Sequence, residues 1–144
     1  MEAPTVPRFI GSHRTPEFFS GSIGQKKASQ LEERFAKFLK ERGVDFSFQM
    51  RILPNGNITE KKSNLPGEVE IDFLAIWYGL IRPVQIDGEI GHYKMPWQIE
   101  LDKEKDARVN QVLKHYGAWP IIRIPYWKIW TPEQTRRLVR EIFT

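Results

Sequence analysis

The sequence predicts an α/β protein with a mixed central sheet, in the order α-β-β-β-α-β-α. Two apolar segments, 68–77 and 80–87, flank Gly79, which allows the tight reversal of a central β-hairpin. Apolar residues at helical spacing follow over 101–116, and a further apolar strand is expected over 119–124. A helix between these last two strands permits a parallel crossover, so we expect both parallel and antiparallel pairing in one sheet.

The segment before the hairpin predicts one helix and one strand. A helix is expected over 28–43, because Ser29 and Glu32 have capping-box spacing and Gly43 suits a C-cap. A half-buried strand is expected over 46–53, where polar and apolar residues alternate. Its apolar residues are expected to share one face of the sheet: Phe46, Phe48, Met50 and Ile52.

Both ends of the chain carry clear local signals. Thr131 is a good N-cap for a last helix, with Pro132 at the first helical position and Gln134 as the capping-box partner. Residues 1–25 are interrupted by proline and glycine, so we expect a partly ordered N-terminal arm. Residues 26–144 are expected to form a single domain.

Composition excludes several classes of protein and site. The 144 residues include no cysteine, which excludes disulfides, thiolate metal sites and a cysteine nucleophile. No apolar run is long enough to cross a membrane and the N-terminus lacks a signal-peptide core, so a soluble cytoplasmic protein is expected. The net charge of +4 favours a polyanionic partner without requiring one.

Polar side chains at the ends of the two hairpin strands are the strongest candidates for chemistry. If residues 78–80 form the reversal, Asp72 lies nearly opposite Gln85, and Asp87 shares a strand face with Gln85. Three oxygen-bearing side chains can then converge as ligands of a hard divalent cation, with the Ile86 carbonyl as a further ligand. The alternative is a polar strand end held by hydrogen bonds.

Residues beyond the second hairpin strand are candidates for proton transfer and DNA contact. His92 follows the strand exit and titrates near neutrality, so it can transfer a proton; the alternative is an ordinary loop histidine. Lys94 and Trp97 belong to a stretch in which cations and aromatic rings interleave, as in sites that hold phosphates and stack on bases. The alternative is aromatic packing at the edge of the sheet.

Six short motifs occur in order between residues 28 and 129. They are S-Q-L-E at 29–32, F-Q at 48–49, I-D-F at 71–73, V-Q-I-D-G at 84–88 followed by His92, D-A-R at 106–108 and I-I-R at 121–123. This ordered set resembles the PD-(D/E)XK nuclease superfamily, and within it the small endonucleases similar to those of very-short-patch repair (Vsr-like). The resemblance implies a restriction-endonuclease-like core.

The resemblance also implies an activity and roles for individual residues. It implies hydrolysis of DNA phosphodiester bonds with Mg²⁺ or Mn²⁺ in repair, recombination, restriction or mobile-element processing. Asp72, Gln85 and Asp87 would be metal ligands, and Glu32 would reach the metal through water or serve only in its capping box. Contacts with the nucleic acid are expected from four residues, the cations binding phosphates and the aromatic ring stacking on bases: Lys94, Trp97, Arg108 and Arg123.

Two departures from the family pattern keep other functions open. Gln85 stands where the family has an acid, and Asp87 stands where it has a lysine. The alternative is therefore a catalytically degenerate module on a nuclease fold that binds DNA or a host protein. A small viral or mobile-element accessory protein is a third possibility. For an active enzyme, we expect DNA as partner and a homodimer where both strands are cut.

Overall fold

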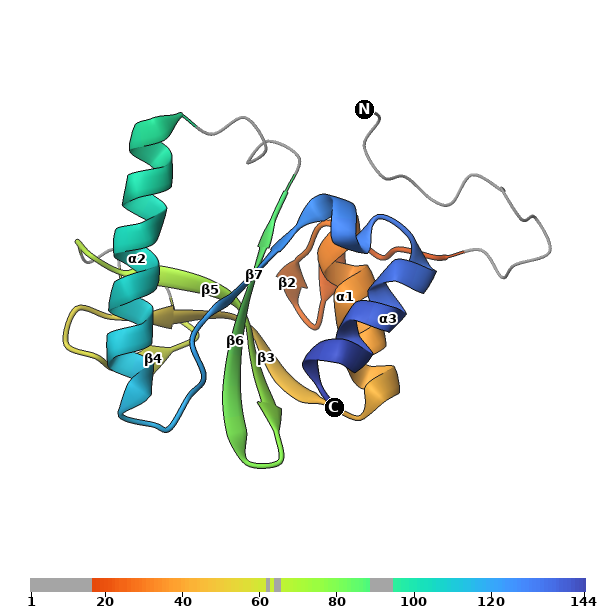
Figure 1. Ribbon diagram of the computed structural model, residues 1–144, viewed down its shortest axis with the longest axis horizontal. Helices are drawn as coiled ribbons and strands as arrows, with labels where there is room; N and C mark the ends of the chain where they lie inside the picture. Colours follow the sequence, from red (N-terminus) through yellow and green to blue (C-terminus); the bar gives the residue numbers. More distant parts are fainter. Residues whose placement is uncertain (1–16, 62, 64–65, 89–94) are drawn as a thin grey trace.

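The computed structural model describes residues 17–61, 63, 66–88 and 95–144. Within these residues the chain forms three α-helices and a mixed five-stranded sheet (Figure 1). The spatial order of the strands is β4-β3-β5-β6-β7. Their bounds are β3 (Asp45–Ile52), β4 (Ile58–Thr59), β5 (Val69–Trp77), β6 (Leu80–Asp87) and β7 (Ile122–Pro125). A separate pair, β1 (Ser22–Ile23) and β2 (Lys26–Lys27), precedes the first helix.

The predicted hairpin and parallel crossover are both present. β5 and β6 are antiparallel and pair Trp77 with Leu80, leaving Tyr78 and Gly79 as a two-residue turn. Both turn residues have positive φ, 51° and 76°, which matches the twist of tight hairpins. β6 and β7 are parallel and are connected through α2 (Pro96–Lys114), so the prediction of a mixed sheet is confirmed.

The helix caps follow the sequence signals closely. α1 (Gln30–Arg42) has the complete capping box of Ser29 and Glu32, and Gly43 ends it in the left-handed region at φ 84°. α3 (Pro132–Ile142) begins after Thr131 with a second complete capping box. Between β7 and α3, the 3₁₀ helix η2 (Tyr126–Ile129) turns the chain.

Two predicted boundaries are wrong. α2 begins at Pro96 rather than at residue 101, because proline at the first helical position already has a helical φ. The apolar residues of its first turns are exposed, so they do not extend the buried stripe from which the helix was predicted. β7 begins at Ile122 rather than at residue 119, because Trp119 makes a single bond to the Ile81 carbonyl (2.9 Å) outside the ladder.

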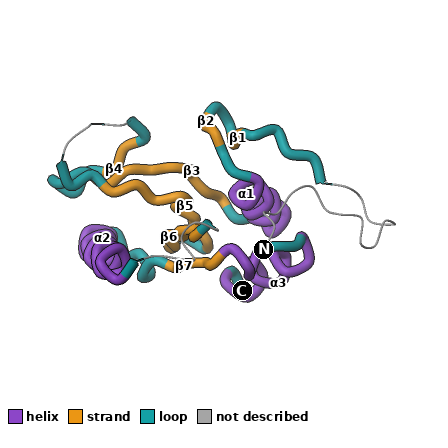
Figure 2. The backbone as a smooth tube through the Cα atoms, turned by 90° about the horizontal axis from the view of Figure 1, so that it is seen from above, coloured by secondary structure: helices purple, strands orange, loops and turns teal. Residues whose placement is uncertain are grey.

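The helices cover opposite sides of the sheet and enclose two apolar clusters. Figure 2 shows α1 and α3 on one side and α2 on the other. The first cluster joins α1 and α3 to the sheet and includes Phe35, Phe73 and Val84. The second joins α2 to the sheet through Val109 and Leu113.

The expectation that the apolar residues of β3 share one face is wrong. Phe46 and Phe48 pack in the cluster of α1 and α3, whereas Met50 and Ile52 pack in the cluster of α2. Gln49 lies between the two pairs in the left-handed region, with φ 56°. A left-handed residue interrupts the two-residue repeat of a strand, so the side chains beyond it change face.

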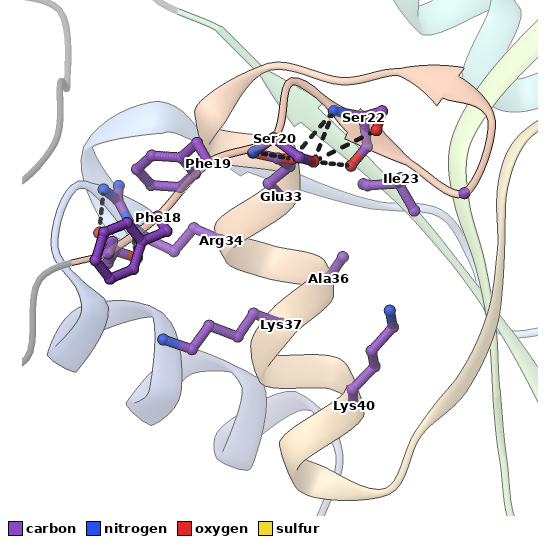
Figure 3. A pocket seen from close by; sticks show the side chains of 12 residues that line it. Phe18, Phe19, Ser20, Ser22, Ile23, Glu33, Arg34, Ala36, Lys37 and Lys40 are labelled. Atoms are coloured by element: carbon purple, nitrogen blue, oxygen red, sulfur yellow. Dashed lines mark hydrogen bonds and ion pairs between the residues drawn. The ribbon is translucent and has the colours of Figure 1, made fainter.

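A buried ion pair anchors the described end of the N-terminal segment. Arg34 of α1 binds the Glu17 carboxylate at 2.7–3.0 Å, and both side chains are buried. The same guanidinium donates to the carbonyls of Ile129 and Trp130 at 2.9 Å. Segment 17–24 therefore lies along α1, with an open hollow of about 390 Å³ between them (Figure 3).

Replacing Glu17 with glutamine should lower the free energy of unfolding by about 3 kcal/mol, because the Arg34 guanidinium would stay buried without its counter-charge. Urea denaturation measures this change. Glu41→Gln is the matched control, because Glu41 pairs with Arg136 where both side chains are exposed, and its effect should stay below about 1 kcal/mol. Equal effects of the two substitutions would contradict the anchoring role.

Candidate functional site

The ladder between β5 and β6 ends where the predicted site begins. The last backbone pair is Phe73 with Val84, and the same register places Asp72 opposite Gln85. Instead of a backbone pair, the Asp72 N–H donates to the Gln85 side-chain oxygen at 3.0 Å. The Ile86 N–H donates to the Asp72 carboxylate at 2.8 Å. Two side chains thus satisfy the backbone donors that follow the ladder.

Backbone pairing between β3 and β5 is also interrupted at Asp72. β3 and β5 pair Phe48 with Phe73 and Met50 with Ile71, and the intervening Gln49 is not paired with Asp72. Lys26 caps this kink by donating from Nζ to the Phe48 carbonyl at 2.6 Å and to the Gln49 carbonyl at 3.4 Å. Asp72 therefore lies at an irregular point between two strands, where proteins often place functional side chains.

β5 changes face at the same level as β3. Phe73 and Ala75 pack with α1 and α3, whereas Val69 and Ile71 pack with α2. Asp72 lies at this change of face and is only 7% exposed. The two strands therefore bury a carboxylate at the point where their alternation shifts.

Burial raises the pKa of Asp72 from 3.8 to about 7. The Ile86 N–H opposes this change, while the negative charges of Glu32, Glu70 and Asp87 add to it. Within the described parts of the chain, no basic side chain forms an ion pair with Asp72. The local charge is therefore suited to a bound cation.

Asp87 lies in a different electrostatic setting from Asp72. Arg123 of β7 binds Asp87 at 2.7 Å and grips both oxygens of Asp106 of α2 at 2.6 and 2.8 Å. The hydrogen bond to Asp106, with the charges of Asp87 and Asp102, raises the pKa of Arg123 against the opposing effect of burial. Arg123 was predicted to contact phosphate, but in the structure it links β6, β7 and α2.

The predicted metal ligands offer two carboxylates and one amide oxygen. In the residues that the structure describes, no group of three or more histidine, aspartate or glutamate side chains is arranged to hold a metal. Mg²⁺ is often held by only one or two carboxylates with water completing the shell. Asp72 and Asp87 are the two carboxylates predicted for this role, and the Gln85 amide oxygen has a second lone pair beyond its bond to the Asp72 N–H.

Glu32 has the capping role that the sequence predicted, and its water-mediated contact with a metal stays a prediction. Its carboxylate accepts from the Ser29 N–H at 2.9 Å and completes the capping box. Its charge also contributes to the raised pKa of Asp72, which shows that the start of α1 lies close to the site. The capping role is therefore compatible with an electrostatic role at Asp72.

The predicted DNA contacts lie in different settings. Trp97 is 64% exposed in the first turn of α2. Arg108 lies against Gly67, where an added Cβ would be 2.8 Å from the guanidinium. His92 and Lys94 lie outside the described residues. The structure thus leaves Trp97 accessible and places Arg108 against the segment that leads into β5.

Three features of the site were not predicted from sequence. The left-handed conformation of Gln49 has no local signal, because glutamine is not among the residues enriched there. Lys26 caps the kink from a distant strand, a contact that depends on the tertiary fold. Asp106 was predicted through its motif, but its pairing with Arg123 was not.

No family model, curated protein or solved structure matches this chain. The relation to PD-(D/E)XK nucleases therefore stays a prediction that rests on the order of the six motifs. Within the described part of the chain, every helix is too short or too polar to span a membrane.

Replacing Gln49 with glycine should give a more stable protein than replacing it with alanine, by about 1 kcal/mol, because only glycine is unstrained at this positive φ. Chemical denaturation of the two variants measures the difference. Ser47, regularly paired with Leu74 in the same strand, is the control, where alanine should be the more stable by about 0.5–1 kcal/mol. If the alanine variant were the more stable of the two at both positions, the kink at Gln49 would be absent in solution.

With divalent cations chelated, Asp72→Asn should stabilise the protein at about pH 8 by up to about 4 kcal/mol, since a tenfold change in proton affinity corresponds to about 1.4 kcal/mol. The pKa of Asp72 is higher in the folded state, so the wild type is favoured by protonation at low pH and loses that stability as pH rises through about 7. The advantage of the variant should therefore shrink to nearly zero at about pH 4. Unfolding free energies across this range test the prediction, with Asp45→Asn, at an exposed position of β3, as control. Parallel pH profiles for wild type and Asp72→Asn would contradict it.

Proposed function

We propose that this protein is a DNA endonuclease that hydrolyses phosphodiester bonds with Mg²⁺ or Mn²⁺ on a restriction-endonuclease-like core. One observation carries the proposal: the buried Asp72 carboxylate has a raised pKa and no basic partner among the described side chains. Gln85 lies against it, and Asp87 follows on the same strand. The order of the sequence motifs supports the choice of DNA hydrolysis over other metal-dependent reactions.

Each residue of the site has a distinct part in this proposal. Asp72 and Asp87 would hold the cation, with the Gln85 amide oxygen and the Ile86 carbonyl as neutral ligands. When bound, the cation lowers the pKa of a coordinated water and offsets charge on the scissile phosphate. The Ile86 N–H fixes one oxygen of Asp72, so this carboxylate is oriented before the substrate arrives.

The substrate and the proton donor are proposed from less direct observations. The net charge of +4 and the exposed ring of Trp97 favour a nucleic acid. His92, which lies outside the described residues, stays the candidate for donating a proton to the leaving 3′ oxygen. A homodimer would supply two sites for cutting both strands of a duplex.

A second candidate function is a degenerate nuclease-fold module that binds DNA or a host protein without cleaving it. The ion pair between Asp87 and Arg123 favours this alternative, because it engages one of the two carboxylates needed for metal. The absence of a lysine two residues after Gln85 favours it as well. This module would bind DNA equally well with and without divalent cations.

Purified protein should nick supercoiled plasmid when Mn²⁺ or Mg²⁺ is added, and Asp72→Asn should reduce the rate by at least about a hundredfold, since metal catalysis contributes several kcal/mol. Agarose gels measure the nicking rate. Asp45→Asn, on the exposed part of β3, should retain wild-type activity. Full Mn²⁺-dependent nicking by Asp72→Asn would disprove the assignment. An inactive wild type that binds DNA without metal would favour the second candidate.

A further inference from the structure

We propose that Arg123 is a built-in cation that takes the place of a second metal ion, so that the site binds a single divalent cation beside Asp72. This inference rests on the proposed function, because it concerns the composition of the same site. It assigns Arg123 a role different from the phosphate contact that the sequence predicted.

The geometry of Arg123 is that of a fixed counter-ion. Its Nε and Nη2 atoms bind the two oxygens of Asp106 at 2.6 and 2.8 Å, a bidentate grip. Its Nη1 atom binds Asp87 at 2.7 Å. The three side chains are 22–27% exposed, so solvent screens these contacts only partly. An arginine side chain is not deprotonated in proteins, so its charge is permanent.

The carboxylates at this end of the sheet divide into two sets. Asp87 and Asp106 are bound by Arg123, and Asp102 adds to its electrostatic environment. Asp72 has no such partner in the part of the chain that the structure describes. Positive charge is therefore already supplied on the β7 and α2 side, and it is lacking at Asp72.

The fold places the two sets next to each other. Arg123 pairs with Gln85 in the parallel register of β6 and β7, and Gln85 bonds to the Asp72 backbone. In two-metal sites the ions lie about 3.5–4 Å apart and share the surrounding ligands. Here the Arg123 guanidinium already binds both oxygens of Asp106 and one oxygen of Asp87. A second divalent cation would therefore lack free carboxylate ligands at this position, and the positive charge of Arg123 would repel it.

The bonds of Arg123 to Asp106 and Asp87 use three of its five guanidinium N–H groups. Arg123 would thus hold Asp87 in place and add positive charge on the β7 and α2 side of the site.

Calorimetric titration with Mn²⁺ tests this inference by counting ions, without relying on activity. Wild type should bind one Mn²⁺ per chain. Arg123→Gln should bind a second, because Asp87 and Asp106 lose their counter-ion, and Arg123→Gln combined with Asp106→Asn should return to one. Arg123→Lys, which keeps the charge, should bind one. Circular dichroism should show the wild-type spectrum for each variant.

The outcomes separate this inference from the proposed function. Two Mn²⁺ in the wild type, or a single Mn²⁺ in a folded Arg123→Gln protein, would overturn the role of Arg123 and leave the nuclease proposal standing. No Mn²⁺ in the wild type would overturn both. If Arg123→Gln does not fold, anomalous scattering from wild-type crystals soaked in Mn²⁺ decides. One peak at Asp72 with Arg123 still bound to Asp106 supports the inference, and a second peak between Asp87 and Asp106 refutes it.

Discussion

Two hydrogen bonds at the end of the ladder between β5 and β6 fix the side chains on which the candidate site depends. The Asp72 N–H bonds to the Gln85 side chain, and the Ile86 N–H bonds to the Asp72 carboxylate. These bonds satisfy buried backbone donors where regular pairing has stopped, and they fix two oxygen-bearing side chains in the same step. The second oxygen of Asp72 bonds to none of the described donors. A strand end that only needed capping would not require a buried carboxylate with a raised pKa.

The kink at Gln49 lies at the level where the buried Asp72 sits between the two clusters. In a regular strand, the face that carries Phe73 would also carry Ile71, and Asp72 would belong to the opposite face. The change of face in β3 and β5 instead places Asp72 between the cluster of α1 and α3 and the cluster of α2. The left-handed conformation of Gln49 and the desolvation of the Asp72 carboxylate each raise the free energy of the folded protein. The Lys26 hydrogen bond beside Gln49 offsets part of the strain of this residue. A bound cation would offset the desolvation of Asp72.

Local sequence signals predicted the helices and strands. The side-chain contacts of the site and the faces of the strands depend on tertiary contacts that these signals do not contain. The capping boxes and the hairpin register depend on residues close in sequence, so the opposition of Asp72 and Gln85 could be predicted. The grip of Arg123 on Asp106 joins residues 17 positions apart on different elements, and no spacing rule points to it. The alternation in β3 predicted the wrong face for Met50, because periodicity assumes that every residue is extended. The burial of Asp72 at the point where β3 and β5 change face could not be foreseen from periodicity.

Asp72 is a desolvated carboxylate with no counter-charge among the described side chains, a setting that favours a bound cation. A ¹³C-detected NMR titration of the Asp72 carboxyl group measures this most directly, first with chelator and then with Mg²⁺. We expect a pKa of about 7 for Asp72 without metal and a clear fall of this pKa when Mg²⁺ is present, because the cation stabilises the ionised form. A pKa near the ordinary aspartate value of about 4, unchanged by Mg²⁺, would contradict it.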